Sequence, residues 1–375
     1  MNSKELFFVI MIVVSSLQLL FFWKESFSLN YCINSIIASG MWVLMLVASR
    51  SGSTILSALP FHTIDKTLKL FFWFNVLIMI FQYILIAVDK NSILPHLVSM
   101  GSGDFIKGVF TNSSVSFIVF SFFVVYFYHF GDKLNALLAI IFMLASTYMS
   151  GIVIFLGITL FMVFAYFSLG TKFKIVTGIS VGIIIFSLVS PKNVDYVVEN
   201  ITQRLFSETD QARKMVSFNQ TGKFITSGVT EAFFGAGGGK FSSRTAFLTA
   251  GDYTEWFPDK YKFISMEFEK NHFSLWNSEL LKVPFKDGTA NQPFSFYNKL
   301  FGEYGFFGFF LFFIFYLGNW IRNFSYLTYG KHIFFLILAY FVLDYWFDYF
   351  TVIVFCELFM GIDLNRRLEY EKREN

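Results

Sequence analysis

Long apolar runs separated by short polar breaks dominate the pattern along this chain. Each run has close to the roughly 20 residues that a helix needs to cross the hydrocarbon core of a bilayer. Eight of them lie near 6–23, 29–48, 68–88, 112–130, 133–149, 151–169, 173–190 and 300–321. A further run, 331–361, is too long for one ordinary span and short for two, with Asp344 and Asp348 in its middle.

The composition agrees with a protein that crosses a membrane many times. Of the 375 residues, 55% are hydrophobic and only 15% are charged, and the mean hydropathy is +0.58. A soluble protein of this size could not cover so much apolar surface with so few charges. The formal net charge of +3 is too small to indicate nucleic acid as a partner.

The distribution of Lys and Arg between the short loops predicts the orientation of the chain. These residues concentrate in the inner loops when the N-terminus lies in the cytoplasm, and a hairpin in the ambiguous run brings the basic C-terminal tail inside as well. We therefore predict an all-α membrane protein with about ten transmembrane helices. Seven fall within residues 1–190, three fall within 300–361, and 362–375 form a cytoplasmic tail. Residues 191–299, called the long polar segment below, then form a large periplasmic loop.

The long polar segment combines two predicted helices with an uneven charge. Apolar residues at helical spacing predict the first helix: Val194, Val197, Val198, Ile201 and Leu205. A second helix is predicted over 210–226. Residues 204–244 carry six bases and three acids, whereas 252–287 carry seven acids and five bases. The basic half predicts an anion site near the membrane surface, with solvated charge on helices as the alternative for any single residue.

The acidic half of the long polar segment is rich in aromatic residues. Sugars pack their C–H faces on aromatic rings, and carboxylates bind sugar hydroxyl groups, so this composition is compatible with a glycan. An aromatic belt at the membrane interface, or a core of the segment itself, is the alternative explanation for each ring. The rings in question are Tyr253, Trp256, Phe257, Tyr261, Phe263 and Trp276.

The stretch "AFFGAGGGKFSS" (232–243) invites comparison with the phosphate loop of ATP-using enzymes. That motif needs Gly, four residues, then Gly-Lys-Ser/Thr. Gly239 and Lys240 fit, but Phe234 stands where the first Gly belongs and Phe241 stands where the Ser or Thr belongs. The sequence thus argues against an ATP site. Successive N–H groups of a glycine turn can instead form a nest for another anion.

Several kinds of chemistry are missing from the sequence. The five histidines have no metal-ligand spacing, and there is no Asp-x-Asp motif and no Gly-x-Ser-x-Gly elbow. Cys32 and Cys356 both lie in apolar runs, so no disulfide framework or thiolate metal site is expected. These observations argue against a nucleotide-sugar enzyme that chelates a divalent ion and against a serine hydrolase.

Four stretches, in order, resemble the family of bacterial O-antigen polymerases and O-antigen ligases. The resemblance covers roughly residues 100–325. The stretches are "IKGVFTNSSVSF" (106–117), "LASTYMSGIVIFLG" (144–157), "QRLFSETDQARKMVSFNQTGKFI" with "FFGAGGGKF", and "NQPFSFYNKLFGEYGFFGFFLF" (291–312). They are similar to the family's "RxxGxFxNPN", "SxSRxG", "R…R…W…GxGxG" and "HNxxLxxLxExGxxG" segments, respectively.

The sequence also departs from the family pattern. Lys107 replaces an Arg, Ser113 replaces a Pro, and the "SxSRxG" segment has lost its Arg. Phe294 and Ser295 stand where ligases have His-Asn. Since ligases are thought to need that His, its loss favours a polymerase, which extends the glycan on its lipid carrier.

The resemblance implies sugar transfer from a polyprenyl-pyrophosphate-linked oligosaccharide on the periplasmic face of the bacterial inner membrane, in a fold similar to the C-type membrane glycosyltransferases. No cofactor is required, because the pyrophosphate leaving group already carries its charge. A chain-length regulator is a further expected partner. We hypothesise that Arg213 and Arg204 are catalytic and stabilise the leaving group. The expected substrate-binding residues are Lys107, Arg244, Lys240, Gly237, Gly238 and Glu303, the last as a helix-start residue that positions a span.

Two other functions remain open at this stage. One is an O-antigen ligase, and the other is a flippase or transporter of lipid-linked oligosaccharides. Transporters often show internal repeats and charges at mid-membrane. The sequence shows no repeat, and a transporter has no obvious use for the long polar segment.

Overall fold

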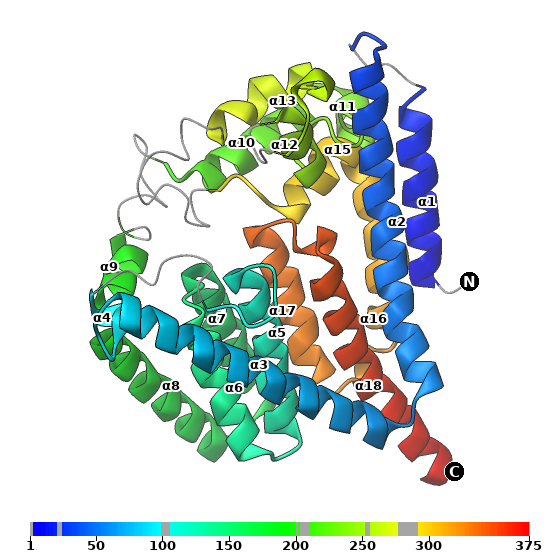
Figure 1. Cartoon of the computed structure of the whole chain (residues 1–375). Helices are drawn as coiled ribbons and strands as arrows, with labels where there is room; N and C mark the ends of the chain where they lie inside the picture. Colours follow the sequence, from blue (N-terminus) through cyan, green and yellow to red (C-terminus); the bar gives the residue numbers. More distant parts are fainter. Residues whose placement is uncertain are drawn as a thin grey trace. The chain divides into compact units, whose positions relative to one another are not determined.

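A computed structural model of the chain describes residues 3–20, 25–98, 106–199, 202, 211–251, 256–276 and 292–374. Within these ranges every regular element is a helix (Figure 1), and each apolar run predicted from the sequence contains one. Five helical stretches are long and apolar enough to cross a membrane: Leu29–Ala58, Phe61–Asp89, Met149–Tyr166, Leu169–Val189 and Phe296–Arg322. The chain is therefore an all-α membrane protein, while the count of ten spans stays a prediction.

Two compact units divide the chain, and each is described by itself. The first unit comprises Met1–Ser51, Arg204–Ser325 and Phe341–Val354, and the second comprises Gly52–Gln203, Tyr326–Tyr340 and Phe355–Asn375. These units follow contacts in space. They do not coincide with the segments 1–190, 191–299 and 300–361 that the sequence pattern delimits.

The first unit packs short helices of the long polar segment against long apolar helices. Within it, α10 to α13 gather near the start of α2 and of α15 (Figure 1). Its helices are α1 (Ser3–Gln18), the first part of α2 (Leu29–Ala58), α10 (Arg213–Ile225), α11 (Val229–Phe234), α12 (Arg244–Ala250), α13 (Met266–Asn271), α15 (Phe296–Leu311) and α16 (Gly318–Arg322). A π-helical stretch, Phe312–Leu317, joins α15 to α16. The predicted helix over 210–226 is confirmed as α10.

A kink at Gly305 brings α15 against α11. Gly305 has φ 61° inside the helix, and a Cβ at this position would lie 2.5 Å from the backbone carbon of Phe233. Only glycine adopts this conformation without strain and leaves room for the neighbouring backbone. The close approach of α11 and α15 sets up the site described below.

Aromatic packing forms the core of the first unit beneath these short helices. The ring of Phe347 lies at the centre, with its centroid 4.6 Å from that of Phe296 and 5.8 Å from that of Phe8. Phe7 and Trp42 also contact Phe347 and are fully buried. Large apolar rings at such distances stabilise a core through buried area and edge-to-face contacts.

The second unit contains the remaining helices of the described chain. They are α3 (Phe61–Asp89), α4 (Pro95–Val98), α5 (Ser113–His129), α6 (Lys133–Ala145), α7 (Met149–Tyr166), α8 (Leu169–Val189), α9 (Pro191–Glu199) and most of α17 (Gly330–Leu343) and α18 (Phe350–Glu374). Asn112 and Asp132 cap α5 and α6 by accepting backbone N–H groups. The amphipathic helix predicted from Val194 onward is present as α9 as far as Glu199, and Ile201 and Leu205 lie outside the described residues.

The ambiguous run 331–361 is two helices with a break between them. α17 ends at Leu343, a short 3₁₀ turn covers Trp346–Asp348, and α18 begins at Phe350. The Tyr329 hydroxyl donates to the Phe359 carbonyl at 2.9 Å, and Asp363 accepts the Gly330 N–H at 2.8 Å. The start of α17 therefore lies beside the middle of α18, as in a hairpin.

Candidate functional site

The glycine turn of the long polar segment is closed by a carboxylate of the chain itself. Glu303 of α15 accepts the Gly239 N–H through Oε2 at 2.8 Å and the Phe241 N–H through Oε1 at 3.3 Å. Its backbone carbonyl accepts the Gly237 N–H at 3.0 Å. The turn has thus formed an anion-binding nest, and the anion is the fully buried Glu303 side chain.

The neighbouring donors of the turn are also engaged. Gly238 N–H donates to Gln18 Oε1 at 2.9 Å, and Ala236 N–H donates to the Gly302 carbonyl at 2.8 Å. Asn34 of α2 donates to the Gly239 carbonyl at 2.9 Å. Three helices, α1, α2 and α15, therefore fasten this turn.

This arrangement gives three of the expected site residues contacts inside the protein. Gly237 and Gly238 are buried with their N–H groups already bonded, so they offer no donors to a substrate pyrophosphate. Glu303 lies inside α15, directly before the Gly305 kink at which one helical stretch is followed by another. Its carboxylate holds the turn in place.

Lys240 is likewise occupied. Its side chain is buried, and Nζ donates to the Tyr31 hydroxyl at 2.7 Å and lies 4.0 Å from the centre of that ring. Burial lowers the pKa of Lys240 to about 8, since a low-dielectric environment disfavours the ammonium. Lys240 therefore holds the turn against α2 and is not placed to bind an external anion.

The arginines lie at a different place, which we call the arginine junction: Arg213, Lys214, Arg244, Lys299, Asp344 and Asp348. Arg213 begins α10 and donates to the Leu275 carbonyl at 3.3 Å. Arg244 begins α12, and its guanidinium lies 4.6 Å from the centre of the Tyr349 ring. Both arginines remain partly exposed. Within the described ranges no carboxylate lies at ion-pair distance from Arg244.

Lys214 ties the junction together from inside. Its fully buried Nζ donates to the Phe294 carbonyl at 2.5 Å and to the Leu343 carbonyl at 2.7 Å. Burial lowers the pKa of Lys214, and the nearby Asp344 charge opposes that shift. Lys214 thus joins the start of α10 to the segment before α15 and to the end of α17.

A buried ion pair lies beside this ammonium. Lys299 Nζ and Asp348 Oδ1 are 2.6 Å apart, and both side chains are almost fully buried. Lys299 also lies 4.4 Å from the centre of the Trp42 ring. The sequence pattern indicates Asp344 and Asp348 inside an apolar run, but it did not identify Lys214 and Lys299 as the cations beside them. The available signal was that acids in an apolar run need a cation.

A buried network of Ser217, His272 and Asn298 resembles a catalytic dyad but does not act as one. Ser217 Oγ donates its one hydrogen to the Pro293 carbonyl at 2.9 Å and accepts from Asn298 Nδ2 at 2.7 Å. His272 Nε2, 2.7 Å away, must then be the donor to Ser217. Burial lowers the pKa of His272 to about 3, so the ring stays neutral. The network joins α10 to the start of α15.

The segment Phe294-Ser295, directly before α15, has a structural role. Phe294 is buried, with its ring centroid 5.3 Å from that of Tyr345. Ser295 caps α15 by accepting the Tyr297 N–H at 3.2 Å, and it donates to the Phe341 carbonyl at 3.1 Å. Neither side chain offers a titratable group.

Two further predicted residues lie elsewhere. Arg204 lies outside the described residues. Lys107 belongs to the second unit, where Gln82 Oε1 accepts the N–H groups of Lys107 and Gly108, each at 2.9 Å. Lys107 Nζ donates to the Thr111 carbonyl at 3.2 Å and stays partly exposed. The turn before α5 thus presents Lys107 at the surface of its unit.

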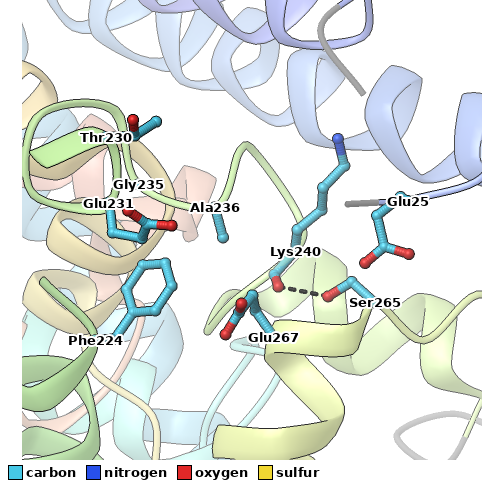
Figure 2. Close-up of a pocket in the computed structure, with 9 residues that line it drawn as sticks. All are labelled: Glu25, Phe224, Thr230, Glu231, Gly235, Ala236, Lys240, Ser265 and Glu267. Atoms are coloured by element: carbon cyan, nitrogen blue, oxygen red, sulfur yellow. Dashed lines mark hydrogen bonds between the residues drawn. The ribbon is translucent and has the colours of Figure 1, made fainter. Parts of the chain in front are cut away.

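A small open pocket lies beside the glycine turn (Figure 2). Three carboxylates reach it from separate parts of the first unit: Glu25 before α2, Glu231 on α11 and Glu267 on α13. The Lys240 ammonium points away from Glu231 and Phe224, while the Lys240 carbonyl accepts the Ser265 hydroxyl at 2.5 Å. The complete lining is Glu25, Phe224, Thr230, Glu231, Gly235, Ala236, Lys240, Ser265 and Glu267.

The described part of the chain contains no group of three or more His, Cys, Asp or Glu side chains that could hold a metal ion. The acids of the pocket and of the arginine junction therefore do not converge as metal ligands do. No protein-family model, curated protein or solved structure matches the chain.

Proposed function

We propose that this protein is a metal-independent membrane glycosyltransferase that polymerises lipid-linked oligosaccharide repeat units into O-antigen or a related surface polysaccharide. The observation that supports it is the union of two segments that resemble the polymerase and ligase family. "FFGAGGGKF" and "NKLFGEYGFFG" are far apart in sequence, yet the Glu303 carboxylate bonds one to the other. Two segments that resemble the same family and are bonded together in the structure support the proposed function better than either segment alone.

In the proposed reaction, an acceptor hydroxyl on one lipid-linked repeat unit attacks the anomeric carbon of the growing chain. The new glycosidic C–O bond forms, the anomeric C–O bond to polyprenyl pyrophosphate breaks, and the hydroxyl proton passes to a base. The pyrophosphate leaves with the bonding electrons. A guanidinium stabilises such charge well, because it is always protonated and can bind phosphate through two N–H groups.

Arg213 and Arg244 of the arginine junction are the side chains that we assign to this role. Both begin short helices of the long polar segment and both are partly exposed. The buried lysines hold the junction, since Lys214 bonds two backbone carbonyls and Lys299 pairs with Asp348. We further propose that the long polar segment faces the periplasm, that both termini lie in the cytoplasm, and that a chain-length regulator is a partner.

A polymerase is favoured over a ligase by the segment before α15. Where a ligase has His-Asn, this chain has a buried Phe294 and a Ser295 used as a helix cap. The nearest functional replacement would be His272, but it is buried and bonded to Ser217. No described imidazole is therefore exposed at this segment.

The test is deletion of the gene in its native host, followed by electrophoresis of the surface glycan. We expect the ladder of long chains to collapse to single repeat units and to return with the plasmid-borne gene. Purified protein should then lengthen the lipid-linked repeat unit extracted from the deletion strain, and EDTA should leave the rate unchanged. A ladder that survives deletion would contradict the proposal. Activity that is lost with EDTA and restored by magnesium would contradict metal independence.

A further inference from the structure

We propose that the second unit binds the phosphate group of an anionic phospholipid in a notch formed by Arg366, Phe61 and Phe130, called the Arg366 notch below. The notch takes no part in the proposed glycosyl transfer. Only its side of the membrane, the cytoplasmic one, depends on the orientation proposed for the chain.

The Arg366 notch holds a guanidinium over two phenyl rings. The guanidinium carbon of Arg366 lies 4.5 Å from the centre of the Phe61 ring and 4.4 Å from that of the Phe130 ring. The two ring centroids are 6.0 Å apart. Arg366 belongs to α18, Phe61 begins α3, and Phe130 directly follows α5. Because stacking on aromatic faces restricts a guanidinium, three separate elements of the second unit orient this one.

The oriented guanidinium keeps its donors for a ligand. Arg366 is exposed, and no acceptor or carboxylate among the described residues bonds to it. A guanidinium has five N–H donors in a planar fork that matches the oxygens of a phosphate. The notch therefore presents a preformed cation whose hydrogen-bonding capacity the protein does not use.

The carboxylate closest to Arg366 along α18 is occupied elsewhere. Asp363, one turn earlier, is buried, and its Oδ2 accepts the N–H groups of Thr328 at 2.6 Å and Gly330 at 2.8 Å. Its Oδ1 accepts the Thr328 hydroxyl. Both oxygens of Asp363 thus hold the start of α17, and neither forms an ion pair with Arg366.

The two carboxylates near the rings are occupied as well. Asp65, one turn after the start of α3, accepts the Tyr126 hydroxyl at 2.7 Å and pairs with Lys69 at 3.1 Å. Asp132 caps α6 and lies 3.7 Å from Lys69. The acids at this end of the second unit are therefore engaged by other donors, which leaves the Arg366 charge without an ion-pair partner.

The position of the notch selects a lipid as the source of the phosphate. α3 is long and apolar enough to cross a membrane, and Phe61 is its first residue, so the notch lies where this helix meets the headgroup region. Clusters of Lys and Arg at this depth attract anionic lipids. The bases at this end outnumber the acids Asp65, Asp132 and Asp363, since they are Lys66, Lys69, Lys133 and Arg366.

The experiment measures the unfolding temperature of the full-length protein in micelles of neutral detergent as a phospholipid is added. Phosphatidylglycerol should raise this temperature, because a ligand of the folded state stabilises it, and phosphatidylcholine should raise it less. The apparent affinity for phosphatidylglycerol should fall about tenfold in Arg366→Ala, which loses charge-assisted hydrogen bonds. Arg366→Lys should lose less, because it keeps the charge without the fork.

Lys66→Ala is the matched control. Lys66 lies exposed in the second turn of α3, carries the same charge and is not part of the notch, so its loss should change the affinity by less than about twofold. Unfolding without added lipid shows whether each variant is folded. If Arg366→Ala does not fold, Arg366→Gln takes its place with the same expected loss.

Three outcomes would overturn the site. One is an unchanged affinity for phosphatidylglycerol in the neutral Arg366 variant. Another is an equal loss in Lys66→Ala, which would mean that general surface charge attracts the lipid. The third is equal stabilisation by inorganic phosphate, which would make the free ion the ligand. Since the assay contains no glycan, none of these outcomes bears on the proposed polymerisation.

Discussion

The glycine turn and the two arginines of the arginine junction all lie in the basic part of the long polar segment, yet the two places differ in how they treat anions. The turn binds a carboxylate of the chain itself, because Glu303 accepts the N–H groups of Gly239 and Phe241. The junction keeps Arg213 and Arg244 partly exposed while Lys214 and Lys299 are bonded inside the protein. In the turn a carboxylate of the chain has taken the donors, whereas no described carboxylate lies at ion-pair distance from Arg244.

The comparison teaches that donor geometry alone does not identify a ligand site. A glycine nest attracts any anion that reaches it, and a carboxylate from the same chain is always present at high effective concentration. Arg244 begins α12 with a partly exposed side chain and no described carboxylate at ion-pair distance, so it retains a capacity that the turn has lost. The following changes test that distinction.

The largest effect is expected at Arg213. If it holds the pyrophosphate in the transition state, Arg213→Ala should lower the polymerisation rate by a hundred- to a thousandfold, or roughly 3–4 kcal/mol. Arg213→Lys should restore part of the rate, because an ammonium lacks the bidentate fork. The measurement is the glycan ladder of the complemented deletion strain together with the rate of the purified protein.

Lys223 provides the control for Arg213. It lies exposed in the last turn of the same helix, so Lys223→Ala should leave full ladders at equal membrane levels. A normal ladder with Arg213→Ala would remove this arginine from the site. It would leave Arg244 as the one described candidate of the junction.

The second effect is structural and falls on the glycine turn. Glu303→Ala removes the acceptor of two buried N–H groups, each of which costs about 1–3 kcal/mol when unsatisfied. We expect a marked fall in unfolding temperature and reduced membrane levels. Glu303→Gln keeps one acceptor oxygen, so its unfolding temperature should fall less than that of Glu303→Ala.

Chemical rescue decides what Glu303 does. Formate supplies a small carboxylate and should raise the unfolding temperature of Glu303→Ala but not that of wild type. An unfolding temperature unchanged by Glu303→Ala would show that the carboxylate is not what closes the turn. The turn would then again be a candidate for the substrate anion.

The membrane helices could be predicted from the sequence, and so could α10. Apolar runs of bilayer length have few alternative folds, because backbone polar groups must be satisfied within the segment. The break at residues 344–349 was also visible, since Asp344 and Asp348 interrupt the apolar run.

The state of the glycine turn could not be predicted in the same way. Its occupant, Glu303, lies 64 residues from Gly239, and nothing local distinguishes a filled nest from an open one. The partners of Asp348 and the burial of Lys240 are equally non-local. Side-chain contacts across a fold depend on the three-dimensional packing, which periodicity does not encode.

The smallest expected effect is a pH dependence at Lys240. Burial lowers its pKa from 10.5 in the unfolded chain to about 8 in the folded protein. Between pH 8 and pH 10.5 the unfolded chain therefore binds more protons, and the free energy of unfolding rises with pH. Lys240→Met has no amine that titrates at this position. The free energy of unfolding of wild type should therefore rise by at least about 1 kcal/mol more than that of the variant from pH 7.5 to pH 10. Unfolding followed by tryptophan fluorescence in detergent measures the difference, with the exposed Lys223→Met as the control.

Parallel curves for wild type and Lys240→Met would mean that Lys240 keeps an ordinary pKa. An ordinary pKa is expected of a lysine that faces solvent, and it would return Lys240 to the candidates for binding the pyrophosphate.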